Sequence, residues 1–433
     1  MLRTMELRNK TERYDLYNAM TYIVLIVAAL TLLLSWWRWR DFYEPAYLLR
    51  REQQEQPESE AQPLYEGDDM LRHYNKHLQL SVVVPACNQA AELRTLIPVL
   101  MQQQFEGKFE VIVVNAGHAD DTEMLLEQWR EVYPNLRSTA IPSTARYIAP
   151  RKLAITLGIR AARSEWALVL HPGCVLHSAK WLSRFARYLT DDCDYVAGYI
   201  NYDDDGTLLA RRAIYERLRR QQTRWRAWRN GVLTGGEAGN YALRKSWFMQ
   251  HQGFADSLAL PFGEEDILLA HHGDAARCRF VVSPALRVGE EVPTRAALAW
   301  QRVELAETLR HLPWRVRLYA WRNALATLSV VALVALVAVY AALRLWADGQ
   351  AATYTLQAWP CDAAIVLLSA AAAVAAIRTM HRGCQALEER EFTLYMCWHA
   401  LWQPWRSCFV ALRRWMHRRD FVRRALPAAL NEQ

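Results

Sequence analysis

Polar residues stand directly after two short apolar runs in the first third of the chain. Asn88 follows the run 80–85, and Asn115, Gly117 and Asp120 follow the run 109–114. Short β-branched runs that lead through a polar turn into a helix indicate buried parallel strands. Ligands of such sheets bind beyond the carboxyl ends of the strands, where these two turns lie. We therefore expect a ligand site here, in which Asn115 can both accept and donate hydrogen bonds.

Two further groups of residues could do chemistry. Lys152 begins a helix after Pro150, and both a lysine charge and a helix N-terminus favour phosphate, although a solvated lysine is an equal reading. Glu264, Glu265 and Asp266 are consecutive. A carboxylate in a binding site can take the proton of a hydroxyl group.

The elements that must position these residues alternate along the chain. We expect strands at 80–85, 109–114, 166–170 and 279–282, with a strand-like segment at 191–201. Amphipathic runs predict helices at 92–104, 123–129 and 153–162, and a long basic helix at 208–228. The sequence Asp203-Asp204-Asp205-Gly206 is typical of a turn. This alternation indicates an α/β fold with a mostly parallel sheet.

Six blocks of the sequence, in order, resemble the family 2 glycosyltransferases of the inverting type. The blocks are 81–88, 111–122, 152–162, 166–182, 236–245 and 262–284. The resemblance implies the GT-A fold over 80–310, a mostly parallel sheet between helices. It also implies a transferase that moves a sugar from a nucleotide sugar, with a UDP-sugar as the expected donor. The family requires a base on the acceptor hydroxyl for direct displacement at the anomeric carbon.

The resemblance also assigns roles to residues. Asp266 is the expected general base with Glu265 beside it, and Glu264 is the alternative if the register is set by Gly263. The residues expected on the nucleotide-sugar side are Pro85, Asn88, Asn115, Gly117, Asp120, Lys152, His171 and Gly173. The residues expected on the acceptor or phosphate side are Gly239, Asn240, Arg244, Lys245, Gln301 and Arg302.

Three features that the family uses are absent from this chain. The metal-binding Asp-x-Asp aligns with His171-Pro172-Gly173, which offers no carboxylate to Mg²⁺ or Mn²⁺. Ala116 stands where an acidic residue contacts the nucleoside, and Glu304-Leu305 stands where Arg-Trp is usual. We therefore assign no metal ligands, although Mg²⁺ or Mn²⁺ is the family's cofactor; His171 could bind a softer metal or be purely structural. The alternative function is a silent subunit that scaffolds or regulates a partner enzyme in the membrane.

Apolar runs at 20–37, 325–345 and 360–377 predict transmembrane helices. They divide the chain into a segment 1–19, a linker 38–79, the central domain and a tail 378–433. Arginines beside the runs place the central domain and the tail on the cytoplasmic side of a bacterial plasma membrane. The expected acceptor is a lipid-linked or cell-surface glycan. Three spans are too few for a polysaccharide channel.

The net charge of +7 comes mostly from the tail. The tail contains ten arginines and five acidic residues, and tryptophans lie among the arginines. This mixture fits a helix that lies on an anionic membrane surface. No nucleic-acid-binding module accompanies the charge, so we expect no nucleic-acid partner. The eight cysteines have no zinc-finger spacing and are expected to be reduced thiols.

Overall fold

The computed structural model of the protein describes residues 79–117, 119–142, 149–320, 381–390 and 392–416, with the single positions Ile26, Ala29, Leu33, Leu49, Val374 and Arg378. Nearly all of the predicted transmembrane runs 20–37, 325–345 and 360–377 lies outside these residues, as do 1–19 and most of 38–79. Among the described residues, no helix combines the length and the apolar character that crossing a bilayer requires.

A seven-stranded sheet forms the centre of the fold, in the order β3-β2-β1-β4-β8-β6-β9. Its strands are β1 (Gln79–Ala86), β2 (Lys108–Asn115), β3 (Leu136–Ala140), β4 (Trp166–Leu170), β6 (Tyr195–Gly198), β8 (Asn240–Arg244) and β9 (Cys278–Val281). Neighbouring strands are parallel except around β8, which is antiparallel to both β4 and β6. The expected α/β fold with a mostly parallel sheet is confirmed.

Helices cover both faces of this sheet, which explains why the strands are apolar at every position rather than at every second one. On one face, Val82 and Val84 of β1 pack with α4 (Ala90–Met101), α5 (Thr122–Val132) and α7 (Trp181–Ala186). On the other face, Val83 packs with α6 (Pro150–Ala161) and with the long helix α8 (Leu208–Arg229). The sheet therefore lies in a continuous core.

A second, three-stranded sheet lies beside the carboxyl end of β4. It contains β5 (Cys174–Leu176), β10 (Val288–Glu290) and β7 (Ile200–Tyr202) in the order β5-β10-β7. The remaining short elements are α9 (Lys245–Gln250), α10 (Glu264–His272) and the 3₁₀ turns η1 (Ala255–Ser257), η2 (Ala275–Arg277) and η3 (Pro284–Leu286). Of these elements, α10 contributes to the walls of the site described below.

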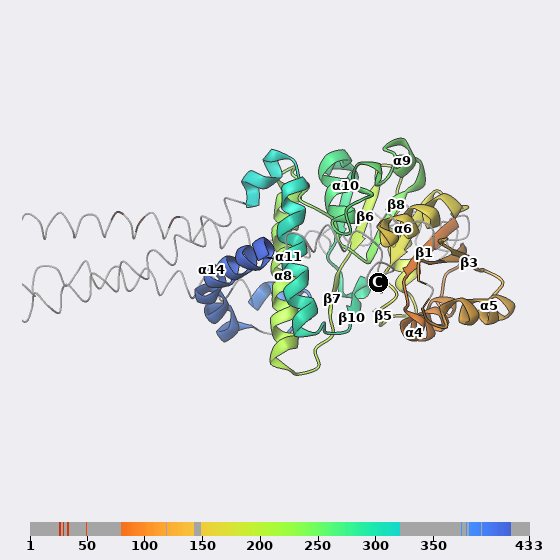
Figure 1. The fold of residues 1–433 in the computed structure, drawn as a ribbon, viewed down its shortest axis with the longest axis horizontal. Helices are drawn as coiled ribbons and strands as arrows, with labels where there is room; N and C mark the ends of the chain where they lie inside the picture. The colour runs from red at the N-terminus through yellow and green to blue at the C-terminus, as the bar shows by residue number, and fades with distance from the viewer. Residues whose placement is uncertain are drawn as a thin grey trace, which may run out of the picture.

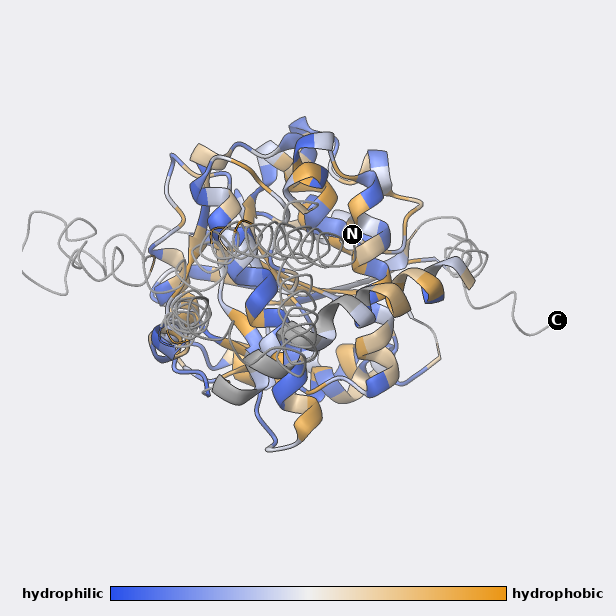
Figure 2. Ribbon diagram, turned by 90° about the vertical axis from the view of Figure 1, so that its left-hand side faces the viewer, coloured by the Kyte–Doolittle hydropathy of each residue, from blue (hydrophilic) through white to orange (hydrophobic). Residues whose placement is uncertain are grey.

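Three helices stand at the end of the molecule that is farthest from β3. In Figure 1, α8 and α11 (Arg295–His311) run side by side, and α14 (Thr393–Met416) lies against them. Figure 2 views this end and shows hydrophilic and hydrophobic residues mixed along the helices. Glu216 of α8 joins the three: it forms ion pairs with Arg302 of α11, at 2.8 Å, and with Arg406 of α14. Through these contacts the tail packs onto the central domain.

Candidate active site

A cavity of about 420 Å³ opens between α8, α10 and α11, beyond the carboxyl end of β4. Its position agrees with the rule that ligands of such sheets bind at this edge. Its walls carry four arginines and six carboxylates, drawn from segments far apart in the sequence. The charged lining residues are Arg151, Arg217, Arg220, Arg224, Glu237, Glu264, Glu265, Asp266, Glu290 and Glu304. The cavity therefore offers groups both for proton transfer and for binding an anion.

Asp266 lies in the first turn of α10, after Gly263, which adopts a left-handed conformation with φ of 69°. Its Oδ1 accepts hydrogen bonds from Arg224 at 2.6 Å and from the amide of Gly236 at 3.2 Å. Among the described residues no group hydrogen-bonds to Oδ2. Burial raises the pKa of Asp266, and Arg224 offsets only part of that effect. Asp266 is thus held in place by one oxygen and is more basic than an ordinary aspartate.

Glu265 is a second unusual carboxylate. It is 4% exposed, and within the described part of the chain its Oε1 has no hydrogen-bond partner. Burial, with the charge of Glu264, raises its pKa to about 7. A carboxyl group with such a pKa in a cavity is typical of a functional site. Glu264 also lines the cavity, and its Oε1 lies 3.9 Å from Arg151 Nε.

The arginines of the cavity differ in their pairing. Arg217 pairs with Glu290, and Arg224 pairs with Asp266 and, at 3.8 Å, with Glu237. Arg220 lines the cavity between them, and the described residues place no carboxylate within ion-pair distance of it. Burial lowers its pKa, as do the charges of Arg217 and Arg224. Arg220 is therefore the cation that an incoming anion would neutralise most favourably.

Sequence analysis missed the arginines of α8, because the helix as a whole is basic. A signal was present, since Arg217, Arg220 and Arg224 are spaced by three and four residues and so share one helix face. Gln221, on the same face, also lines the cavity. Only the packing of α8 against the sheet distinguishes this face from its other arginines.

The two predicted polar turns do lie together at the carboxyl ends of β1 and β2, where Ala86 is paired with Asn115. Their side chains mostly bond to the backbone. Asn88, with φ of 52°, accepts from the amide of Ala119, and Asn115 accepts from the amide of Gly117. A Cβ on Gly117 would lie 2.3 Å from Asn88 Oδ1, so the glycine permits this close approach.

Asp120 and Pro85 also have structural contacts. Asp120 accepts hydrogen bonds from the amides of Ala90, at the start of α4, and of Thr122, at the start of α5. Burial raises the pKa of Asp120, but the hydrogen bonds lower it by more, so the pKa lies below its ordinary value. Pro85 is paired with Val114 within the ladder of β1 and β2. These residues shape the edge of the sheet, and the described cavity does not include them.

Lys152 does not have the expected position. Its side chain is fully buried, and its Nζ donates to the carbonyl oxygen of Ser257 at 2.8 Å. Burial lowers the pKa of Lys152 to about 8. The preceding residue, Arg151, lines the cavity instead, because neighbouring residues of a helix point about 100° apart. Of the two basic residues at the start of α6, Arg151 is therefore the one that faces the cavity.

Arg244 and Lys245, which were predicted on the acceptor side, lie away from the cavity. Because β8 runs antiparallel to β4, Arg244 is paired with Trp166, at the edge opposite the cavity. There Arg244 bonds to Asp191 at 3.0 Å, and Lys245 donates to the carbonyl of Ala162 at 2.6 Å. Both side chains hold loops together.

Of the other residues predicted on the acceptor side, one lines the cavity and the others do not. Asn240 is fully buried, donates to the carbonyls of Tyr199 and Leu286, and does not line the cavity. Arg302 points to Glu216, away from the cavity. Gln301, one residue before it, lines the cavity and accepts a hydrogen bond from Tyr202 at 3.2 Å.

His171, Gly173 and Gly239 meet near the carboxyl end of β4. His171 Nδ1 accepts from the amide of Gly173 at 3.1 Å, and the carbonyl of Gly239 accepts from the amide of His171. Gly239 has φ of 92°, and a Cβ there would lie 3.0 Å from His171 Cβ. Burial lowers the pKa of His171 to about 4, as does the charge of Arg151.

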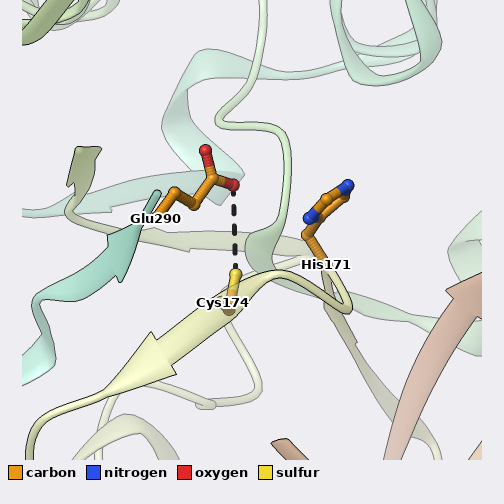
Figure 3. Close-up of side chains that lie close together, drawn as sticks. All are labelled: His171, Cys174 and Glu290. Carbon is orange, nitrogen blue, oxygen red and sulfur yellow. Dashed lines mark hydrogen bonds between the residues drawn. The ribbon is translucent and has the colours of Figure 1, made fainter. Parts of the chain in front are cut away.

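Cys174 and Glu290 lie next to this histidine. Sequence analysis did not connect them with it, because Glu290 is distant in sequence. The three ligand atoms lie within 4.8 Å of one another. Figure 3 shows the three side chains close together. Only one of them is the carboxylate oxygen that Mg²⁺ or Mn²⁺ prefers. The residues present therefore do not fit the metal that the family resemblance implies.

Comparison with known proteins agrees with this architecture. Residues 81–251 match the family model described as "Glycosyl transferase family 2". No curated protein matches the chain. The chain is similar in structure to a mannosyltransferase from Pyrobaculum calidifontis in complex with GDP-Man and Mn²⁺. The two sequences are 16% identical, the match covers 88% of this chain and 99% of the other, and the TM-score is 0.48.

Two further solved structures are similar over a smaller part of the chain. Glucosyl-3-phosphoglycerate synthase from Mycobacterium tuberculosis, in complex with Mn²⁺, UDP-glucose and phosphoglyceric acid, has 17% identity, coverage of 58% and 86%, and a TM-score of 0.38. TarS from S. aureus in complex with UDP has 15% identity, coverage of 59% and 71%, and a TM-score of 0.35. The family match spans residues 81–251, which is less than half of the chain.

Proposed function

We propose that this glycosyltransferase moves a sugar from a UDP-sugar to a hydroxyl group of its acceptor by direct displacement at the anomeric carbon. The observation that carries the proposal is the cavity itself. It combines a well-oriented carboxylate, Asp266, with the cation of Arg220, which has no carboxylate within ion-pair distance among the described residues. The first group serves the attacking hydroxyl, and the second serves the departing diphosphate.

Asp266 is the general base in this reaction. Because Arg224 and the amide of Gly236 hold Oδ1, Oδ2 is the atom that takes the proton of the acceptor hydroxyl. The hydroxyl oxygen then forms a bond to the anomeric carbon as the bond from that carbon to the diphosphate oxygen breaks. The raised pKa of Asp266 makes this proton transfer more favourable than it would be to an exposed aspartate.

Negative charge grows on the diphosphate as it leaves. Arg220 and Arg151 are the side chains proposed to balance that charge, since neither is fully neutralised by a close carboxylate. Arg151 also lies in the first turn of α6, where the helix N-terminus favours an anion. These two arginines would balance the charge of the leaving diphosphate, which a carboxylate-bound metal balances in the family.

Calorimetry of UDP binding to the purified full chain in detergent tests this proposal. Arg220→Gln should weaken UDP binding at least tenfold, because it removes the charge that faces the diphosphate. Arg219→Gln is the matched control on the same helix and should leave binding unchanged, since Arg219 is absent from the cavity wall. Absence of binding at millimolar UDP would overturn the UDP-sugar proposal.

A bacterial plasma membrane is the proposed location, with the domain on the cytoplasmic side and a lipid-linked or cell-surface glycan as acceptor. The predicted apolar runs support this location, and so does α14. Along one side of α14, apolar side chains at helical spacing are 48–74% exposed: Trp402, Trp405, Phe409, Leu412, Trp415 and Met416. Such a stripe suits the interface of a bilayer.

The position of α11 favours a membrane-derived acceptor in particular. Gln301, Leu305 and Thr308 of α11 line the cavity, while α14 packs against the same helix. The helix α11 therefore lies between the cavity and α14, so an acceptor anchored in the membrane surface would need to pass these two helices to reach the cavity.

The silent-subunit alternative has one observation in its favour. No carboxylate stands at the Asp-x-Asp positions 171–173, and loss of metal assistance raises the barrier of transfer by several kcal/mol unless other groups replace it. If the wild-type chain binds no nucleotide, this alternative becomes the better account. Binding that depends on Arg220 favours the enzyme.

A further inference from the structure

His171, Cys174 and Glu290 come from three strand ends that the two sheets bring together. His171 follows β4, Cys174 begins β5, and Glu290 ends β10. The antiparallel pairing of β10 with β5 sets Glu290 directly opposite Cys174, with 4.0 Å between Oε1 and Sγ. In Figure 3 the ring of His171 turns one nitrogen toward this pair. A backbone ladder fixes Cys174 and Glu290, while His171 lies in the short turn between β4 and β5.

The ligand types select a particular class of metal. An imidazole nitrogen, a thiolate sulfur and a carboxylate oxygen suit Zn²⁺ and similar transition metals, whereas Mg²⁺ and Mn²⁺ favour oxygen ligands. Zinc bonds of about 2.0–2.3 Å bring ligand atoms to about 3.5 Å from one another in a tetrahedron. The three atoms here lie within 4.8 Å, so small side-chain rotations would close the site.

Neighbouring groups already orient the three side chains. Glu290 is paired with Arg217 through Oε2, which leaves Oε1 facing Cys174. Cys174 lies 3.4 Å from the carbonyl of Gly239, and the left-handed conformation of Gly239 lets that loop approach His171. Partners of this kind fix metal ligands in place and strengthen binding. The thiol proton is released when the metal binds.

Charge and access are also compatible with a metal. The thiolate and the carboxylate of Glu290 would bring two negative charges to the ion, and Glu290 pairs with Arg217 at the same time. His171 and Glu290 line the cavity while Cys174 is buried behind them. A fourth coordination position would therefore open into the cavity, as it does in zinc sites that bind a water or a substrate.

We propose that His171, Cys174 and Glu290 form a binding site for a divalent transition metal of the zinc class. The site stands at the position of the family's Asp-x-Asp but differs from it in ligands and in metal. The inference concerns metal binding alone, and it holds or fails independently of the transfer reaction.

Titration of the purified, metal-stripped full chain with Co²⁺ tests the proposal, because a cobalt–thiolate bond absorbs in the near ultraviolet. The wild-type protein should show this absorption at one equivalent, and Zn²⁺ should remove it. Cys174→Ser should abolish the absorption. His171→Ala and Glu290→Gln should weaken Co²⁺ binding about tenfold or more while the thiolate remains.

Cys193→Ser is the matched control, since Cys193 is a buried thiol in another part of the core. It should bind Co²⁺ as the wild type does. Three results would overturn the proposal: no cobalt–thiolate absorption in the folded wild type, the same absorption in folded His171→Ala and Glu290→Gln, or displacement of Co²⁺ by Mn²⁺ as readily as by Zn²⁺. UDP binding measured on the same samples separates this failure from failure of the donor site.

Discussion

Three neighbouring carboxylates at the start of α10 show how position decides the chemistry of a residue. Asp266 is held by Arg224 through one oxygen, Glu264 lies near Arg151, and Glu265 is buried without a pairing partner for Oε1 among the described residues. A helical turn points successive side chains in different directions, so each enters a different environment. Among the described residues, Asp266 has one oxygen held by two hydrogen bonds and one oxygen without a hydrogen-bond partner.

Asp266→Asn tests the base directly. The amide keeps the size of the side chain but cannot take a proton, so transfer should fall at least about a hundredfold while UDP binding is retained. Transfer is measured with a radiolabelled sugar donor and membrane lipid extract as acceptor. Asp256→Asn is the control, because Asp256 is exposed and contacts only His272 by ion pairing among the described residues. Equal losses in both variants would exclude Asp266 as the base.

Glu265 gives a prediction about stability and pH. Its pKa is about 7 in the folded protein and ordinary in the unfolded chain, so the folded state binds more protons between these values and stability falls as pH rises. Glu265→Gln removes this loss of folding stability at high pH, which is on the order of 3 kcal/mol above pH 7. The melting temperature of the variant should therefore exceed that of the wild type at pH 8, with little difference at pH 4.5. A rise of equal size at both pH values would contradict the buried-charge explanation.

At the scale of elements, α8 connects the site to the rest of the molecule. One face presents Arg217, Arg220 and Arg224 to the cavity, while Glu216 reaches α11 and α14. Burial would raise the pKa of Glu216, but the charges of Arg406 and Arg302 lower it overall. One buried carboxylate thus holds the cations of two other helices.

Glu216→Gln should destabilise this helix junction. The variant keeps the shape of the side chain but leaves the arginines without their counter-charge, which costs about 3 kcal/mol for a buried cluster. We expect a lower midpoint in chemical unfolding, together with faster hydrogen exchange in α14. Glu131→Gln on α5, where the residue is exposed, should change neither quantity. An unchanged exchange rate in α14 would mean that the ion pairs do not hold this helix.

At the scale of the whole molecule, the cavity and the exposed stripe of α14 lie on either side of α11. This arrangement is suited to an enzyme that meets its acceptor at a membrane surface. It depends on residues 381–416 packing back onto the domain, where Glu389 bonds to Tyr199 at 2.7 Å.

Fluorescence of a labelled cysteine tests the membrane-facing stripe. In a background with the exposed Cys87 and Cys408 changed to serine, Phe409→Cys carries an environment-sensitive dye in lipid nanodiscs. Its emission should shift to the blue on anionic lipid, because position 409 would enter the interface. Met124→Cys on α5, also exposed, should not shift. Equal emission at the two positions would contradict contact between α14 and the bilayer.

The sequence by itself predicted the strands β1, β2, β4 and β9, the helices α4, α5, α6 and α8, and the resemblance to a family. Runs such as 109–114 are apolar because both faces of the sheet are covered, and that burial leaves a direct trace in residue type. The position of the site, beyond the carboxyl ends of the strands, follows from the same pattern, and Asp266 lies at it.

Only the tertiary structure decided which charged residues face the cavity. A one-residue step exchanges Lys152 for Arg151, and of the predicted neighbours Gln301 and Arg302 only Gln301 lines the cavity, because helix neighbours point in different directions. The antiparallel direction of β8 removes Arg244 and Lys245 to the opposite edge of the sheet. The pairing of β10 with β5 brings Glu290 to Cys174 across more than a hundred residues, a contact that no local pattern encodes.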